Sequence, residues 1–368
     1  MRRDVEKDLT VFDQTAFDAH ERALFVHDAE TGLRAIIAIH STALGPAGGG
    51  CRLWTYASAD AALTDALLLS RGMSYKNALA GLPMGGGKAV ILGPLESANR
   101  RRAFEAFGRA VDSLGGNYVT AEDVGVSVSD MDAIAVATKF VSGRRAANGV
   151  GGDPSPHTAR GVRIGLEAAV AHALSRTSLD GVRVALQGLG HVGAHLCREL
   201  AERGARLVVA DIDTRRVEET CDLYGAQPCA PEDILFADVD VVAPCALGAI
   251  LHEGVLDRLR ASVIAGAANN QLATSAVGEA LHQRGVTYAP DYLINAGGII
   301  AVAAEYFGVT DVVRVDFAIE RIGERTREVL ERSAREDLPS AAIADSMARA
   351  TIAGERREER VIDPGSAV

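Results

Sequence analysis

The fold of this 368-residue chain is decided by the stretch Val182-Arg183-Val184-Ala185-Leu186-Gln187-Gly188-Leu189-Gly190-His191-Val192-Gly193. Its first six residues have the apolar character of a fully buried strand, and the glycines then follow in G-x-G-x-x-G spacing. A helix is predicted over 192–202, and a second buried strand over 206–210 ends at Asp211. A strand, a glycine turn, a helix and a terminal acid in this order predict a Rossmann dinucleotide-binding unit.

The same motif predicts how the cofactor is held. Glycines let the backbone approach a pyrophosphate, which the amides at the start of the helix stabilise. Asp211 would accept hydrogen bonds from the ribose hydroxyls and repel a 2′-phosphate, so NAD is preferred over NADP although Arg215 and Arg216 follow. Strands expected over 239–243 and 262–265 end in small residues, where ligands bind in parallel sheets. The predicted cofactor contacts here are Gly188, Gly190, His191, Val192, Gly193, Asp211, Ile212, Cys245, Ala246, Ala267 and Asn269.

A second informative feature is Lys88, which follows three glycines and precedes an apolar strand. Burial disfavours the charged form of a lysine and lowers its pKa, which turns an ammonium into a usable base. Lys76 lies nearby in the sequence, and two cations in one cleft would attract an anion. A nucleotide phosphate loop fails here, because Leu82 and Ala89 stand where that pattern needs Gly and Ser or Thr. A surface lysine on a tight glycine turn stays open as an alternative.

The amino-acid composition limits which classes of protein the chain can belong to. Hydrophobic residues make up 48% of the chain and the net charge is −11, with both signs of charge interspersed. This predicts about two packed domains and disfavours a nucleic-acid surface. Neither a signal peptide nor a membrane span is expected, and five scattered cysteines indicate a reducing, cytoplasmic setting. Cys245 is expected to be a core filler, with a catalytic thiol as the alternative, and His191 and His195 have no third ligand, so no metal is predicted.

The rest of the chain reads as a two-domain α/β protein. Strand-like runs over 33–39, 89–92 and 117–120 alternate with helix-like runs over 60–72, 98–114 and 130–141, and a glycine- and proline-bearing hinge is predicted over 143–156. We expect a substrate-binding and oligomerisation domain from 1–144 plus about 335–368, whose last helices return to it. We expect a Rossmann domain from 145–334.

Several motifs in order resemble the leucine/valine/phenylalanine dehydrogenase family, part of the amino-acid dehydrogenase superfamily that also includes glutamate dehydrogenase. The resemblance covers nearly the whole chain. It rests on residues 44–52, 73–77, 83–88, 121–125, 153–158, 266–271, 289–292 and 295–298.

The resemblance implies roles for individual residues. Lys76 would bind the substrate α-carboxylate with the backbone amides of Gly49 and Gly50, Lys88 would activate water, and Asp123 would shuttle protons to the amino group. Ser155 and Thr158 would orient the nicotinamide carboxamide, and Asn295 would lie near both the nicotinamide and the carboxylate. A purely structural role stays open for three of them: Asp123 as a turn cap, Thr158 as a helix cap and Asn295 as an N-cap.

The implied reaction is the NAD-dependent, reversible oxidative deamination of a hydrophobic L-amino acid to its 2-oxo acid and ammonia. A leucine or valine substrate is favoured. Gly48 stands where the leucine-type pattern has a leucine, and it either admits an aromatic ring, as for phenylalanine or tryptophan, or its space is filled by a neighbour. Thr326 replaces an aliphatic residue of the expected pocket wall and Val329 is retained. A homo-oligomer assembled through the first domain is also implied.

Two other classes of function remain for comparison. An NAD-binding regulator with a dead site would be expected to lack Lys76, Lys88 or Asp123, and all three are present. A hydroxy-acid dehydrogenase would use a paired histidine and carboxylate near the cofactor, and it would leave the two lysines unexplained.

Overall fold

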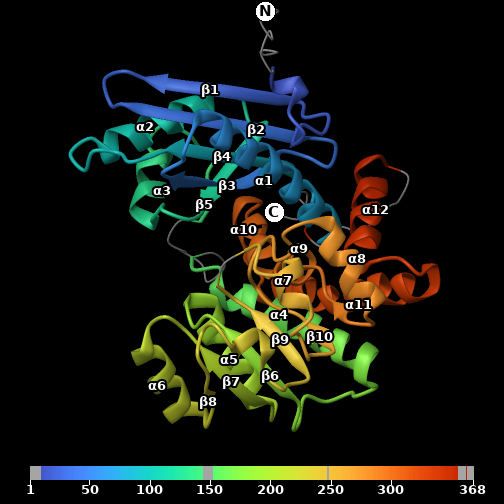
Figure 1. Cartoon of the computed structure of the whole chain (residues 1–368). Helices are drawn as coiled ribbons and strands as arrows, with labels where there is room; N and C mark the ends of the chain where they lie inside the picture. The colour runs from blue at the N-terminus through green and yellow to red at the C-terminus, as the bar shows by residue number, and fades with distance from the viewer. Residues whose placement is uncertain (1–9, 144–151, 247, 355–361, 363–368) are drawn as a thin grey trace, which may run out of the picture. The chain divides into compact units, whose positions relative to one another are not determined.

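The structure is a computed structural model that describes residues 10–143, 152–246, 248–354 and 362. The chain divides into two compact units, one formed by Met1–Ala78 and Pro83–Arg145 and the other by Leu79–Leu82 and Ala146–Val368. Figure 1 shows the helices and strands of each unit. The prediction of a two-domain α/β protein is confirmed. Most of the predicted hinge over 143–156 lies outside the described residues.

The first unit is built on a five-stranded mixed sheet with the order β1-β2-β4-β3-β5. Strands β1 and β2 pair antiparallel, as do β2 and β4, whereas β3 runs parallel to both β4 and β5. The parallel strands therefore bring their carboxyl ends to one edge, where the loop after β5 begins. The bounds are β1 Arg22–Asp28, β2 Leu33–Ser41, β3 Ala47–Trp54, β4 Gly85–Leu92 and β5 Tyr118–Glu122.

Helices cover both faces of this sheet, as the alternation of its side chains requires. Helix α1 (Ala59–Leu79) packs through Leu63 and Leu67 against Ile36 and Val90. Helices α2 (Arg100–Asp112) and α3 (Val128–Ala135) form the larger core on the other face with Leu33, Ile37, Ile91 and Tyr118. A short 3₁₀ helix, Val11–Asp13, precedes β1.

The structure excludes one alternative and corrects one expectation in this unit. The glycines before Lys88 do not form a turn, because β4 begins at Gly85 and they pair with β2 and β3. The helix predicted over 130–141 ends at Ala135. Beyond it, the amide of Thr120 donates to the carbonyl of Phe140 and Val141 bridges to Thr120, so tertiary pairing with β5 replaces the helix.

The second unit is built on a six-stranded, wholly parallel sheet with the order β11-β10-β9-β6-β7-β8. This is the doubly wound order of a Rossmann fold, whose strand order reverses between β6 and β9. The predicted dinucleotide-binding architecture is confirmed. The bounds are β6 Arg183–Gln187, β7 Arg206–Ala210, β8 Gln227–Pro228, β9 Val241–Pro244, β10 Val263–Ile264 and β11 Thr287–Tyr288.

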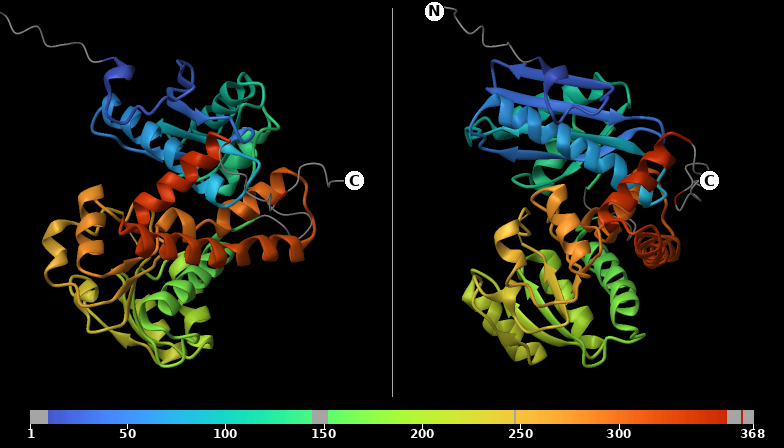
Figure 2. Two further views of the ribbon diagram at one scale, coloured as in Figure 1. Left: turned by 90° about the vertical axis from the view of Figure 1, so that its right-hand side faces the viewer. Right: turned by 45° about the vertical axis from the view of Figure 1, so that its right-hand side comes forward.

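Helices on both faces complete the second unit. Figure 2 shows the long helix α11 running beside α4. The helices are α4 Ser155–Leu174, α5 His191–Glu202, α6 Thr214–Tyr224, α7 Glu253–Leu256, α8 Ser275–Gln283, α9 Asp291–Ile294, α10 Gly297–Tyr306, α11 Val312–Glu336, α12 Ser340–Ile352 and the 3₁₀ helix Ile234–Phe236. Among the helices of the described ranges, none is long and apolar enough to cross a membrane.

The last helix belongs by its contacts to the second unit. The hydroxyl of Ser340 donates to the carbonyl of Tyr288 at 2.6 Å, and the hydroxyl of Tyr292 donates to Asp345 at 2.5 Å. Residues from about 335 onward were expected to return to the first domain, and their role in that domain stays a prediction.

Candidate functional site

The strongest site feature of the first unit is a buried ion pair between Lys88 and Asp123. Lys88 lies in β4 and Asp123 directly follows β5, and the Nζ atom of the lysine is 2.7 Å from Oδ2 of the carboxylate. The lysine side chain is 7% exposed. A tight contact of this kind allows a proton to pass between the two groups.

The pair is extended by a second cation. Nε of Arg52 lies 3.1 Å from Oδ2 of Asp123, and its Nη1 lies 3.1 Å from Asp65. The hydroxyl of Tyr56 donates to the same oxygen of Asp65 at 2.6 Å. Asp123 is therefore held between the cations of Lys88 and Arg52, and Arg52 is in turn held by the carboxylate of Asp65.

This arrangement fixes the charge of Asp123. Burial by itself would raise the pKa of its carboxyl, but the charges of Lys88 and Arg52 outweigh that effect and lower the pKa to about 2. Asp123 is thus an ionised acceptor across the neutral pH range, as a proton shuttle requires before it takes up a proton.

Helix α1 carries Lys76 past the first residues of β4. A Cβ on Gly86 would lie 2.1 Å from the backbone nitrogen of Ser74, so only glycine lets α1 approach β4 this closely. One turn later the side-chain amide of Asn77 donates to the carbonyl of Gly85 at 2.6 Å. Lys76 stands between these two contacts and is partly exposed.

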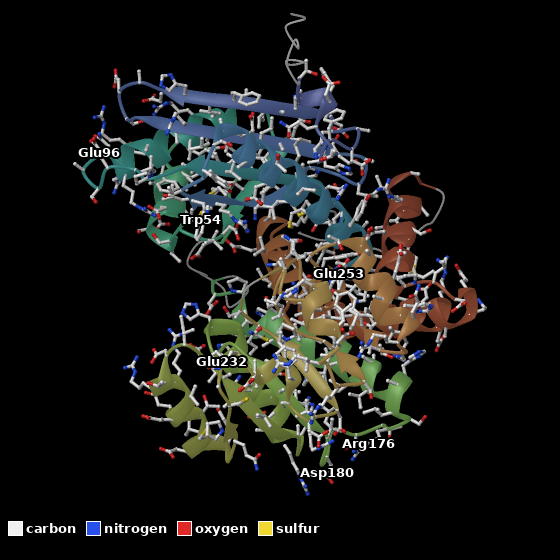
Figure 3. The ribbon with its side chains drawn as sticks, in the orientation of Figure 1. Trp54, Glu96, Arg176, Asp180, Glu232 and Glu253 are labelled. Carbon is white, nitrogen blue, oxygen red and sulfur yellow. The ribbon has the colours of Figure 1, made fainter. Side chains whose placement is uncertain are left out.

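The predicted carboxylate-binding glycines lie in the middle of β3. Pairing with β4 occurs at Ala47 and Gly48 and resumes at Cys51, and the hydroxyl of Tyr118 donates to the carbonyl of Gly49 at 2.7 Å. A Cβ on Gly50 would lie 2.9 Å from the Cβ of Asp123. Strand β3 ends at Trp54, whose side chain is exposed (Figure 3). The role of the Gly49 and Gly50 amides stays a prediction.

In the second unit, the glycine turn has the geometry that a pyrophosphate needs. Gly188 has φ +95° and a Cβ there would lie 2.8 Å from the Cβ of Ala246, while a Cβ on Gly193 would lie 1.9 Å from the carbonyl of Gly188. Gly190, the N-cap of α5, has no protein atom within 4 Å of an added Cβ among the described residues. Two glycines thus shape the turn and the third leaves open space at a helix N-terminus.

Asp211 lies beside that turn, as predicted. Its Oδ2 accepts a hydrogen bond from the amide of Leu189 at 2.5 Å, and its Oδ1 accepts one from the amide of Asp213 at 2.8 Å. Asp211, which directly follows β7, therefore links the glycine turn after β6 to the segment after β7 through its two carboxylate oxygens. The neighbouring side chain of Ile212 is exposed, as is that of His191, and Val192 is partly buried.

Asn295 offers a buried acceptor. Its Nδ2 donates to the carbonyl of Ala267 at 3.1 Å and to Oδ1 of Asn269 at 2.9 Å, whereas its own Oδ1 has no hydrogen-bond partner among the described residues. Leaving a buried oxygen unsatisfied is costly, so this atom is suited to accept a bond from a ligand amide. Together with the open space at Gly190, it shows that the residues present fit a dinucleotide.

Other predicted residues have local roles in the structure. The hydroxyl of Thr158 donates to the carbonyl of Pro154 at 3.0 Å, and the amide of Ser155 donates to Asp153 at 2.9 Å, so both lie in the first turn of α4. Thr326 is buried in α11 and donates to the carbonyl of Ile322 at 2.7 Å; Val329 is buried on the same helix. Contacts of these four residues with cofactor or substrate stay predictions.

The remaining sequence hypotheses concern cysteine and metal chemistry. Burial raises the pKa of the Cys245 thiol to about 12, which disfavours a catalytic thiolate. All five cysteines are free. No cluster of three or more potential metal-ligating side chains occurs within the part of the chain that the structure describes.

Sequence reasoning missed three residues of the first site. Arg52 appeared only as the last residue of a glycine motif, Asp65 as one acid of a helix, and Met84 as an apolar residue before the glycines. An arginine that directly follows an uncharged glycine-rich run was the one available signal, because a cation that becomes buried needs a buried partner.

The chain matches known proteins along most of its length. Residues 20–140 match the family model described as "Glu/Leu/Phe/Val dehydrogenase, dimerisation domain", and residues 209–354 match that of "Glutamate/Leucine/Phenylalanine/Valine dehydrogenase".

Individual relatives are similar over about nine tenths of the chain. The leucine dehydrogenase of Bacillus subtilis (strain 168) is 47% identical over 338 residues, covering 92% of this chain and 93% of that protein. The valine dehydrogenase of Streptomyces virginiae is 44% identical and covers 89% of this chain and 92% of its own. The crystal structure of L-tryptophan dehydrogenase from Nostoc punctiforme superposes with a TM-score of 0.80 at 41% identity, over 92% of this chain and 98% of that one.

Proposed function

The chain belongs to the glutamate/leucine/phenylalanine/valine dehydrogenase family, and from this premise we propose that it catalyses the reversible oxidative deamination of a hydrophobic L-amino acid to its 2-oxo acid and ammonia. A substrate of the leucine or valine type is supported by the leucine and valine dehydrogenases among its relatives. The single observation that carries the chemistry is the buried contact of 2.7 Å between Lys88 and Asp123.

The first unit would hold and orient the substrate. In this proposal the ammonium of Lys76 binds the α-carboxylate, with help from the amides of Gly49 and Gly50. The close packing of α1 on Gly86 supports this role, because it fixes the helix turn that carries Lys76. Holding the reacting carbon of the substrate in a fixed orientation supplies a large part of the reduction in the activation barrier.

Proton transfer would fall to the ion pair. The Lys88 ammonium first passes its proton across the short contact to Asp123, and the neutral amine that results removes a proton from the water that adds to the imine carbon. Asp123 then delivers this proton to the amino nitrogen, which leaves as ammonia, and the regenerated carboxylate takes up the hydroxyl proton as the added oxygen becomes the carbonyl of the 2-oxo acid. Burial of both groups excludes bulk water that would compete for these protons.

NAD is the proposed cofactor, and when bound its nicotinamide accepts the hydride from the substrate Cα. The turn Gly188–Gly193 would hold the pyrophosphate and Asp211 the adenosine ribose, which disfavours the additional phosphate of NADP. Asn295 would accept a hydrogen bond through its Oδ1, which has no hydrogen-bond partner in the described part of the chain. Ser155 and Thr158 would orient the carboxamide from the start of α4.

We also propose a homo-oligomer in the cytoplasm. The description of residues 20–140 as a dimerisation domain supports assembly through the first unit. Five free cysteines support a reducing compartment.

A turnover assay tests the proposal. The purified chain is given L-valine, L-leucine, L-phenylalanine, L-tryptophan or L-glutamate with NAD or NADP, and reduced cofactor is followed. We expect NAD-dependent turnover, highest with L-leucine or L-valine, and the reverse reaction with the 2-oxo acid and ammonia. Highest activity with an aromatic substrate would favour the phenylalanine or tryptophan alternative. Activity on L-glutamate alone would refute the substrate class, and cofactor binding without any turnover would support a regulator.

A further inference from the structure

The space beside Gly48 is filled in the structure. Gly48 is buried in β3, and a Cβ built on it would lie 2.7 Å from Cε of Met84 and 3.2 Å from its Sδ. The next nearest atom is Nδ2 of Asn77 at 3.7 Å. The thioether end of Met84 therefore lies where a larger residue at position 48 would place its side chain.

The backbone around Met84 is fixed while its side chain can adapt. Gly85 donates its amide to the carbonyl of Pro46 at 3.0 Å and accepts the side-chain amide of Asn77 at 2.6 Å. Met84 itself is 1% exposed. Methionine has an unbranched, flexible side chain that fills irregular gaps and repacks at low cost. A change in this side chain would therefore alter the space at Gly48 without moving the strand.

Gly48 and Lys88 lie on the same face of the sheet. Gly48 pairs with Gly86, and Lys88 is two residues further along β4, so alternation of side chains directs both toward the face covered by α1. The same register offset places Gly50 opposite Lys88, next to Asp123. The space at Gly48 therefore lies about 7 Å along the same face from the residue opposite Lys88, which is within reach of the side chain of an amino acid whose reacting carbon meets Lys88.

We propose that Met84 is the specificity-determining residue of the first unit and sets the size of amino-acid side chain that the enzyme accepts. The proposal rests on the proposed deamination at Lys88. Gly48 does not enlarge the pocket in this arrangement, because Met84 takes up the volume that the glycine leaves. Gly48 and Met84 together fill the space that a single large side chain at position 48 would fill, and they favour aliphatic over aromatic substrates.

The test compares substrates on the same enzyme preparation. The ratio of kcat/KM for L-phenylalanine to that for L-leucine is measured in the wild type and in Met84→Ala. Removing the end of the side chain should raise this ratio by about tenfold or more, since one or two methylene groups in an apolar pocket change selectivity by roughly 10–200-fold. The ratio does not depend on the fraction of folded enzyme, which cancels between substrates.

Met131→Ala is the matched control, because Met131 is fully buried in the core cluster on the opposite face of the same sheet. It should lower stability and leave the ratio unchanged. Gly48→Ala approaches the same space from the other side: the new methyl group displaces the end of Met84, so the ratio should fall. In the double variant Gly48→Ala with Met84→Ala, the ratio should return most of the way from its Gly48→Ala value to the wild-type value. The reason is that the two side chains compete for one space.

The outcomes separate the two proposals. Turnover of L-leucine with an unchanged ratio in both Met84→Ala and Gly48→Ala overturns the role of Met84, and so does an equal rise in Met131→Ala. If Met84→Ala does not fold, Gly48→Ala still decides the matter. A wild type that deaminates no amino acid defeats the proposed function itself.

Discussion

Lys88 and Asp123 come from different strands, β4 and the end of β5, and meet at 2.7 Å in the interior of the first unit. The contact depends on β3, which lies between these two strands. Where β3 runs beside the ion pair, it carries glycines, so no side chain of β3 separates the two groups. Arg52, also on β3, completes the charge balance around the carboxylate. The side chains of Lys88, Asp123 and Arg52 form one electrostatic network, because each changes the electrostatic surroundings of the others.

Replacement of Lys88 by alanine should lower kcat by at least about a hundredfold, because a positioned acid or base contributes on the order of 10²–10⁴ to the rate. Turnover with L-leucine and NAD measures the loss, and circular dichroism checks the fold. Lys139→Ala is the control, since Lys139 is an exposed lysine of the same unit. Near-normal turnover in Lys88→Ala would rule out its role as the base.

Stability should depend on pH through Asp123. Its pKa is lowered from 3.8 to about 2 in the folded protein, so the carboxylate stabilises the fold above pH 4 and this contribution disappears as the pH falls toward 2. The contribution is about 2 kcal/mol in the free energy of unfolding. Urea titrations between pH 5 and pH 2.5 should show a steeper loss of stability in the wild type than in Asp123→Asn. Parallel pH dependences in the two proteins would contradict this.

Arg52→Gln should raise the pKa of Asp123, because one of the two cations that lower it is removed. The acidic limb of the kcat/KM profile should then move to higher pH by on the order of one unit, with a smaller change in KM for the amino acid. Arg102→Gln removes a more exposed pair with Glu30 and should leave the profile unchanged. A loss of activity without a shift of the acidic limb would indicate a purely structural role.

Two glycines of the cofactor-binding turn should differ in how their substitution affects stability and the KM for NAD. In Gly188→Ala the new methyl group meets Ala246 at 2.8 Å and the residue has φ +95°, so stability should fall by about 2 kcal/mol. In Gly190→Ala the methyl group meets no described protein atom within 4 Å, so the melting temperature should hardly change. Its KM for NAD should nevertheless rise about tenfold or more, because the space is needed by the pyrophosphate. An unchanged KM would argue against cofactor binding at this turn.

Asp211→Asn preserves an acceptor for the amide of Leu189 but removes the negative charge. We expect KM for NAD to rise and that for NADP to fall, since repulsion of the 2′-phosphate is lost. The ratio of kcat/KM for the two cofactors should shift toward NADP by about tenfold. Asp222→Asn, on the exposed face of α6, is the matched control. Equal changes with both cofactors would mean that Asp211 only supports the turn.

The sequence by itself determined the Rossmann unit. Strand, turn, helix and acid follow one another along the chain, and β6, α5 and β7 lie within one residue of their predicted bounds, because local hydrophobic patterning and glycine spacing specify them. The glycine run before Lys88 and the family resemblance at Asp123 also singled out two residues that the structure brings together, and their roles stay predictions. The same local reasoning failed after Ala135, where hydrogen bonds to β5 replace a predicted helix, and at Gly85–Gly87, which are part of a strand.

Only the tertiary structure decided which side chains meet. Arg52 contacts Asp123 and Asp65 because β3 lies beside β5 and beneath α1, and no local pattern encodes that adjacency. Likewise, the sequence left open whether the space at Gly48 was empty or filled, and packing places the end of Met84 there. Interiors are packed to high density by residues distant in sequence, so a missing side chain at one position is compensated by a neighbour that only the fold reveals.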